Sequence, residues 1–184
     1  MSVDLPSSLI TGNHIAVVGN CGKISQRKDG ALIDKHDVVI RFNFAFPVPE
    51  MVESLGQRTD MMIVAKGVLL RTNRKRRLMR NIRRDHKDTH IIGRLPTSLL
   101  EYHLPSQVRG ACKSLISREP TTGAITVHAL MTVFNPASIT VFGFDGLKTG
   151  VWYSDKSNSR RHRPKREQMW LESIKDKVAV IEYS

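Results

Sequence analysis

The sequence predicts an α/β fold in which helices cover both faces of a mostly parallel sheet. Short β-branched runs, such as residues 14–19, end in glycine or a small polar residue, as strands that feed tight turns do. These runs are apolar throughout, and helix-like segments separate them. Strands that are buried on both faces have this pattern, and they are typical of parallel sheets.

Each element of this prediction has its own local signal. Short apolar runs bounded by turn residues predict six strands, at 14–19, 37–43, 60–65, 90–93, 138–144 and 177–183. Helical spacing of apolar residues predicts four helices, at 76–84, 97–117, 122–134 and 164–176. The last helix is the best specified, because Pro164 fits its first turn without losing a hydrogen bond. Sites in such folds lie at the carboxyl ends of the strands.

Length and composition indicate one globular domain over residues 1–184. The chain is 40% hydrophobic and 25% charged, with no internal repeat and no low-complexity linker. No apolar run reaches the roughly 18–20 residues that cross a bilayer, and the first residues do not resemble a secretory signal. The two cysteines do not make a disulfide framework, so we expect a cytoplasmic location.

The charge predicts an anionic partner. The formal net charge is +12, and the excess gathers in residues 71–87 and 156–166. Solvated surface is the simplest interpretation of both clusters. A nucleic acid would suit them, but no aromatic residues are interleaved for base stacking. An acidic glycan, a phosphorylated lipid or an anionic membrane at which the protein is peripheral suits the charge equally well.

Two short polar motifs follow or precede the predicted apolar elements. Gly19 and Asn20 come directly after the first strand, and Asn43 ends the second. Thr121, Thr122 and Gly123 precede the nearly all-apolar helix 124–134, whose free amides and dipole would attract a phosphate. Taken singly, each motif is explained as a turn or a helix cap.

The aspartates narrow the class of ligand. No two of them are separated by a single residue, so the metal clamp common in transferases that use nucleotide diphosphates is missing. The histidines are too scattered for a recognisable metal site. We therefore expect no metal and no cofactor, and a donor with a single phosphate, such as a nucleoside-monophosphate sugar.

Together, the motifs resemble the four conserved motifs of the animal-type sialyltransferases. Residues 15–22 (Ile-Ala-Val-Val-Gly-Asn-Cys-Gly), continuing through 33–43 and 56–60, resemble the long motif. Residues 120–123 through 139–144 resemble the short motif. Trp152-Tyr153 is similar to the third motif, and His162 with Glu167 has the spacing of the very short motif. The four matches occur in the family's order.

The resemblance implies a fold, a reaction and a set of site residues. The fold would be a Rossmann-like three-layer sandwich of the sialyltransferase GT-A variant. The reaction would be metal-independent, inverting transfer from a CMP-sugar to a hydroxyl of a glycan acceptor; the charge alone suggests that this acceptor is a glycolipid at the membrane. His162 would be the general base, with Glu167 stabilising the loop and helix around it. The donor would be bound by Gly19, Asn20, Asn43, Thr121, Thr122, Gly123 and Tyr153.

The chain also departs from the family. Ile15 stands where one of the paired motif cysteines would be, and Tyr153 replaces the histidine of the third motif. We also expect no membrane anchor or stem. We interpret these departures as those of a short, soluble relative from a bacterium or a virus.

The sequence therefore predicts a CMP-sugar-dependent glycosyltransferase of glycan biosynthesis, with sialic acid as the donor sugar. Kdo, another acidic sugar activated as CMP, is the alternative donor. The alternative from another class is a basic nucleic-acid-binding module with a degenerate nucleotide pocket. We favour the transferase, and then expect no nucleic acid among the partners.

Overall fold

A computed structural model describes residues 3–65, 67, 84–96, 100–146, 148–153 and 162–182. The helix predicted at 76–84 lies almost entirely outside these residues, as does most of both basic segments. None of the described helices is both long and apolar enough to cross a bilayer.

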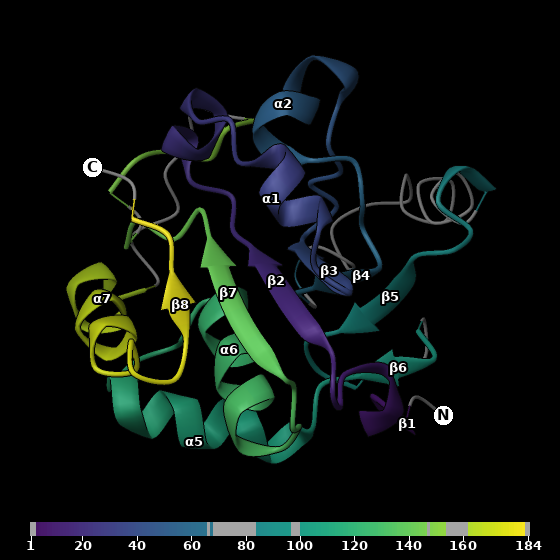
Figure 1. The fold of residues 1–184 in the computed structure, drawn as a ribbon. Coiled ribbons are helices and arrows are strands. Elements are labelled where there is room, and N and C mark those ends of the chain that lie inside the picture. Colours follow the sequence, from purple (N-terminus) through teal and green to yellow (C-terminus); the bar gives the residue numbers. More distant parts are fainter. Residues whose placement is uncertain are drawn as a thin grey trace.

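The described strands form one eight-stranded parallel sheet, as predicted. Its order is β1-β6-β5-β4-β3-β2-β7-β8 (Figure 1). In the register, Val17 of β2 pairs with Ile40 of β3 and with Val141 of β7. The strands are β1 (Val3–Asp4), β2 (His14–Val18), β3 (Val38–Phe42), β4 (Met61–Val64), β5 (His90–Gly93), β6 (Tyr102–His103), β7 (Ser138–Phe142) and β8 (Ala179–Val180). The two-residue strands β1 and β6 are too short to leave a periodic signal in the sequence.

Helices lie on both sides of this sheet, which gives three layers (Figure 1). On one face lie α5 (Ser106–Ile116), α6 (Thr122–Thr132) and α7 (Pro164–Glu172); on the other lie α1 (Gly30–Asp34) and α2 (Val52–Leu55). Short 3-10 helices complete the described elements: η1 (Ser7–Leu9), η2 (Gly22–Gln26) and η3 (Pro49–Met51).

Successive residues of the central strands enter different cores. Ile15 and Val17 of β2 pack with α5, α6 and α7, whereas Ala16 and Val18 pack with η2, α1 and α2. Both sets are fully buried, because side chains alternate across a strand and each face of the sheet is covered. This is why the strands read as continuous apolar runs.

The predicted helix over 97–117 is wrong in its first part. Strand β6 occupies Tyr102–His103, and α5 begins only at Ser106. Pro105, with ψ of 128°, is extended and disfavours helix in the residue before it, so the helix starts after the proline.

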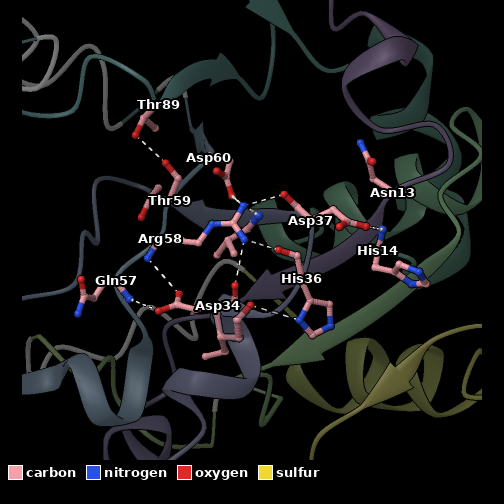
Figure 2. A network of polar contacts seen from close by, with 12 residues as sticks. Asn13, His14, Asp34, His36, Asp37, Gln57, Arg58, Thr59, Asp60 and Thr89 are labelled. Carbon is pink, nitrogen blue, oxygen red and sulfur yellow. Dashed lines mark hydrogen bonds and ion pairs between the residues drawn. The ribbon is translucent and has the colours of Figure 1, made fainter.

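A polar network ties the amino-terminal ends of the central strands together (Figure 2). The Arg58 guanidinium donates to the carbonyl oxygens of Asp34 and Asp37 and to the carboxylate of Asp60. The Asp34 carboxylate in turn accepts the backbone N–H groups of Gln57 and Arg58. Residues 56–60, which resemble the end of the long motif, thus fasten α1 to β3 and β4 at the edge of the sheet opposite the predicted site.

We expect Arg58→Ala to lower the free energy of unfolding by about 1–2 kcal/mol. It leaves several carbonyl oxygens without a donor, although solvent compensates in part because 39% of the side chain is exposed. Urea denaturation would measure the change. Arg84→Ala, which removes an exposed ion pair with Asp85, is the control and should change stability by less than about 0.5 kcal/mol. Equal effects of the two variants would contradict this role for Arg58.

Candidate active site

A cavity of about 700 Å³ opens at the carboxyl ends of the strands. Residues that directly follow β2, β3, β4, β5 and β7 line it, and it lies beside the point between β2 and β7 where the strand order reverses. Every residue predicted for the site lines this one cavity: Gly19, Asn20, Asn43, Thr121, Thr122, Gly123, Tyr153, His162 and Glu167. Their individual roles stay predictions.

Asn43 is held in an unusual backbone conformation at the cavity wall. Its φ is 56°, in the left-handed region that asparagine adopts more readily than most residues. Its Oδ1 accepts the N–H of Ala65 at 3.0 Å, which fixes the amide plane. The Nδ2 group, which has no partner among the described residues, remains available to a ligand.

Asn20 and Tyr153 lie together on another wall, although they are far apart in the sequence. The N–H of Trp152 donates to the Asn20 carbonyl at 3.1 Å, and the side chains of Asn20 and Tyr153 are hydrogen-bonded. Burial raises the pKa of Tyr153, an effect that the bond to Asn20 opposes. The phenol is therefore neutral near pH 7 and can donate a hydrogen bond.

The amino terminus of α6 faces the cavity with two free amides. Thr121 is the helix cap, since its Oγ1 accepts the N–H of Ala124 at 3.1 Å. The N–H and hydroxyl of Thr121 both donate to Glu167, so neither is free for a ligand. The N–H groups of Thr122 and Gly123 have no partner in the described part of the chain, and the dipole of this buried helix favours an anion there.

Phe144 joins the two glycine motifs, and sequence reasoning did not single it out. A Cβ on Gly123 would lie 2.6 Å from the Phe144 ring, and a Cβ on Gly19 would lie 2.4 Å from the carbonyl oxygen of Gly143 and 2.7 Å from that ring. The ring also meets Phe42 edge-to-face at 6.3 Å. The two glycines therefore make room for this aromatic side chain as well as for a ligand.

His162 is oriented by a backbone carbonyl. Its Nδ1 lies 2.9 Å from the carbonyl oxygen of Glu119. A carbonyl oxygen only accepts, so Nδ1 carries the proton, and Nε2 of the neutral ring has a free lone pair. This is the tautomer that a general base needs. Nothing in the sequence pointed to Glu119 as the partner.

Glu167 is buried against the cap of α6. It is 9% exposed, and its two carboxylate oxygens accept the Thr121 N–H at 2.8 Å and the Thr121 hydroxyl at 2.7 Å. Burial raises its pKa, while the hydrogen bonds from Thr121 oppose the rise. Glu167 thus connects the helix that follows His162 to the amino terminus of α6.

The raised pKa of Glu167 predicts a pH-dependent stability difference. The folded state binds this proton more tightly than the unfolded state, so the contribution of Glu167 to stability falls as pH rises from the unfolded pKa through the folded one. Glu167→Gln has no titrating carboxylate at this position. Compared with this variant, the wild-type protein should lose free energy of unfolding as pH rises from about 4 to above the folded-state pKa of Glu167. Urea denaturation at several pH values would measure the difference, with exposed Glu172→Gln as the control for losing one carboxylate of the same helix. A free energy of unfolding of the wild-type protein that rises with pH relative to that of Glu167→Gln would contradict the expected sign.

The other described charges at the cavity are mostly paired. Lys175 contacts Glu172 at 2.8 Å, whereas Asp145 accepts the Thr149 N–H at 2.8 Å through Oδ2 and its buried Oδ1 has no partner among the described residues. Lys148 is the basic lining residue for which the described part of the chain provides no ion pair. Within that part, no three His, Cys, Asp or Glu side chains gather to hold a metal ion, and the metal independence of the reaction stays a prediction.

The comparisons with known proteins bear on the long motif and on the fold. Residues 10–95, just under half of the chain, match the model of glycosyltransferase family 29 (sialyltransferase). This segment of the chain is similar to the sialyltransferases. The predicted resemblance is thereby confirmed over these residues, and the match supports a sialyltransferase-like glycosyltransferase. No curated protein matches the sequence.

Solved sialyltransferases share the fold. A mammalian sialyltransferase in complex with Gal-beta-1-3GalNAc-ortho-nitrophenol has a TM-score of 0.66 at 15% identity, over 98% of this chain and 73% of that one. The monofunctional alpha-2,3-sialyltransferase Cst-I from Campylobacter jejuni has a TM-score of 0.63 at 14% identity, over 98% and 78%. CstII from the same organism, in complex with the substrate analogue CMP-3FNeuAc, has a TM-score of 0.58 at 12% identity, over 91% and 78%. The predicted three-layer sialyltransferase fold is confirmed, and a bacterial or viral source stays a prediction.

Proposed function

We propose that the protein is an inverting glycosyltransferase that moves sialic acid from CMP-sialic acid to a hydroxyl of a glycan acceptor. The observation that carries this proposal is the convergence of four sequence motifs on one cavity. An anion-binding helix terminus and an imidazole with a free Nε2 line the same space. A donor phosphate and an acceptor hydroxyl need these two features within reach of each other.

The donor phosphate would lie at the amino terminus of α6. There the N–H groups of Thr122 and Gly123 and the positive end of the helix dipole stabilise the charge that builds up on the departing CMP. Tyr153, beside Asn20, supplies a neutral donor to the same cavity. Lys148 adds a positive charge at the rim.

His162 would activate the acceptor. Its Nε2 takes the proton of the acceptor hydroxyl while that oxygen bonds to the anomeric carbon and the bond from this carbon to the phosphate oxygen breaks. CMP leaves with the bonding electron pair. Attack from the face opposite the phosphate inverts the anomeric centre, which requires base and phosphate site on different walls.

Binding and turnover experiments separate the alternatives. Thermal shift should report stabilisation by CMP and not by UMP, UDP or GDP. Stabilisation by a short oligonucleotide with no response to CMP would instead support the nucleic-acid-binding module. Product analysis with CMP-sialic acid and with CMP-Kdo identifies the donor sugar, and we expect the first to be consumed. Consumption of CMP-Kdo alone would support a CMP-sugar glycosyltransferase but contradict sialic acid as the donor sugar.

A glycolipid acceptor at an anionic membrane, and with it a peripheral cytoplasmic location, stays a proposal. Its support is the charge of +12 and the two basic segments. Binding to anionic vesicles that is lost at high salt is the expected result, because exposed charges are screened there. Absent or salt-independent binding would contradict it.

A further inference from the structure

We infer that Glu119 is a positioning residue for His162: two arginines hold its carboxylate, and its backbone carbonyl fixes the imidazole. No sequence motif pointed to this residue. Its consequence for catalysis rests on the proposed function, whereas its effect on the imidazole does not.

The geometry gives Glu119 two separate tasks. Its carbonyl oxygen accepts the Nδ1–H of His162 at 2.9 Å. Its carboxylate accepts Nε–H of Arg109 at 3.0 Å and lies 3.4 Å from Nη2 of Arg94. Side chain and main chain of one residue thus connect the imidazole to two guanidinium groups.

These contacts join three parts of the chain that are far apart in the sequence. Arg94 follows β5, Arg109 lies on α5, and His162 precedes α7. Glu119 itself lies in the segment between α5 and α6. The loop that carries His162 is therefore tied to the sheet and to α5 through one residue rather than only through its own helix.

The charges around Glu119 keep its carboxylate ionised. Burial raises its pKa, but the hydrogen bond from Arg109 and the charges of Arg109 and Arg94 outweigh burial and lower it. Nε of Arg94 is buried and has no hydrogen-bond partner in the described part of the chain. An unsatisfied buried donor is costly, and among the described residues the Glu119 carboxylate forms an ion pair with this guanidinium.

The tautomer is what this arrangement controls. A neutral imidazole released from the carbonyl can carry its proton on Nε2, and such a ring cannot accept a proton there. Loss of the partner that orients a metal-ligating histidine typically costs about 10–100-fold, and we expect a loss of similar size here. A merely structural role for Glu119 would lower stability without moving the ring proton.

The test compares Glu119→Gln with Glu53→Gln. The control removes a carboxylate from an exposed ion pair with Lys28, away from the cavity. In ¹⁵N NMR spectra above the titration range of histidine, His162 of Glu119→Gln should show a share of the Nε2–H tautomer that the wild-type protein lacks. Its kcat should fall about 10–100-fold while KM for the CMP-sugar stays within about twofold. Arg109→Lys, which keeps one charged contact, should fall between Glu119→Gln and the wild-type protein.

A double variant distinguishes failure of this inference from failure of the proposed function. In a His162→Ala background, Glu119→Gln should cost no further activity, because both act on one group. An unchanged His162 tautomer in Glu119→Gln would overturn the positioning role. Losses of activity that add in the double variant would overturn it as well. A shifted tautomer in Glu119→Gln together with full transfer by His162→Ala would uphold the positioning of the ring and remove its catalytic use.

Discussion

Replacing His162 with alanine is expected to lower kcat for sialyl transfer by about 10²–10⁴-fold while leaving CMP binding unchanged. Positioned proton transfer contributes a factor of this size, and Nε2 is the base that the proposal assigns to the acceptor hydroxyl. CMP binding should survive, because the helix amides of Thr122 and Gly123 do not depend on the imidazole. Single-turnover kinetics and CMP titration by calorimetry would measure both quantities.

The matched control is His90→Ala. His90 is exposed at the amino-terminal end of β5, at the opposite edge of the sheet from the cavity. This variant should keep transfer and CMP affinity within about twofold. Transfer by His162→Ala at the wild-type rate would remove the assigned base. Release of free sialic acid in place of product would indicate that donor cleavage has been uncoupled from the acceptor.

The sheet was predictable because each of its longer strands carries its own signal. The run at 14–19 is apolar on both faces and ends in glycine, and the structure has β2 there with a covered core on either side. The loops that follow β2 and β3 lie at the same edge of the sheet, because these two parallel strands are neighbours. Because the carboxyl ends of parallel strands lie at one edge of the sheet, the predicted strands also predict where the site lies.

What could not be predicted depends on contacts between distant residues. Glu119 gains its relation to His162 through a backbone carbonyl, which every residue has, so its side-chain type gives no signal. Phe144 lies in a segment that reads as an ordinary strand end, and its place between two glycines arises only when β7 is placed beside β2. Pro105 is a local signal for the start of α5, but the helix over 97–117 was predicted from the spacing of apolar residues alone.

The Gly123→Ala variant is expected to lose about 1–3 kcal/mol of stability and most of its CMP affinity. The new Cβ would lie 2.6 Å from Cε1 and Cζ of Phe144, well inside van der Waals contact. The ring can relieve this overlap only by turning toward the cavity, or α6 must move away from the sheet. The first response fills the donor site, and the second withdraws the amides that would hold the phosphate.

Gly110→Ala provides a control of identical chemistry in another helix. Gly110 lies within α5, and nothing is within 4 Å of the position of its absent Cβ. Alanine there should therefore raise stability by about 0.5–1 kcal/mol, through the lower backbone entropy of the unfolded chain. The two substitutions should thus shift the urea midpoint in opposite directions, and only Gly123→Ala should weaken CMP binding, by at least about tenfold. Parallel shifts, or a Gly123→Ala protein that binds CMP as the wild-type does, would mean that Phe144 does not set the shape of the donor site.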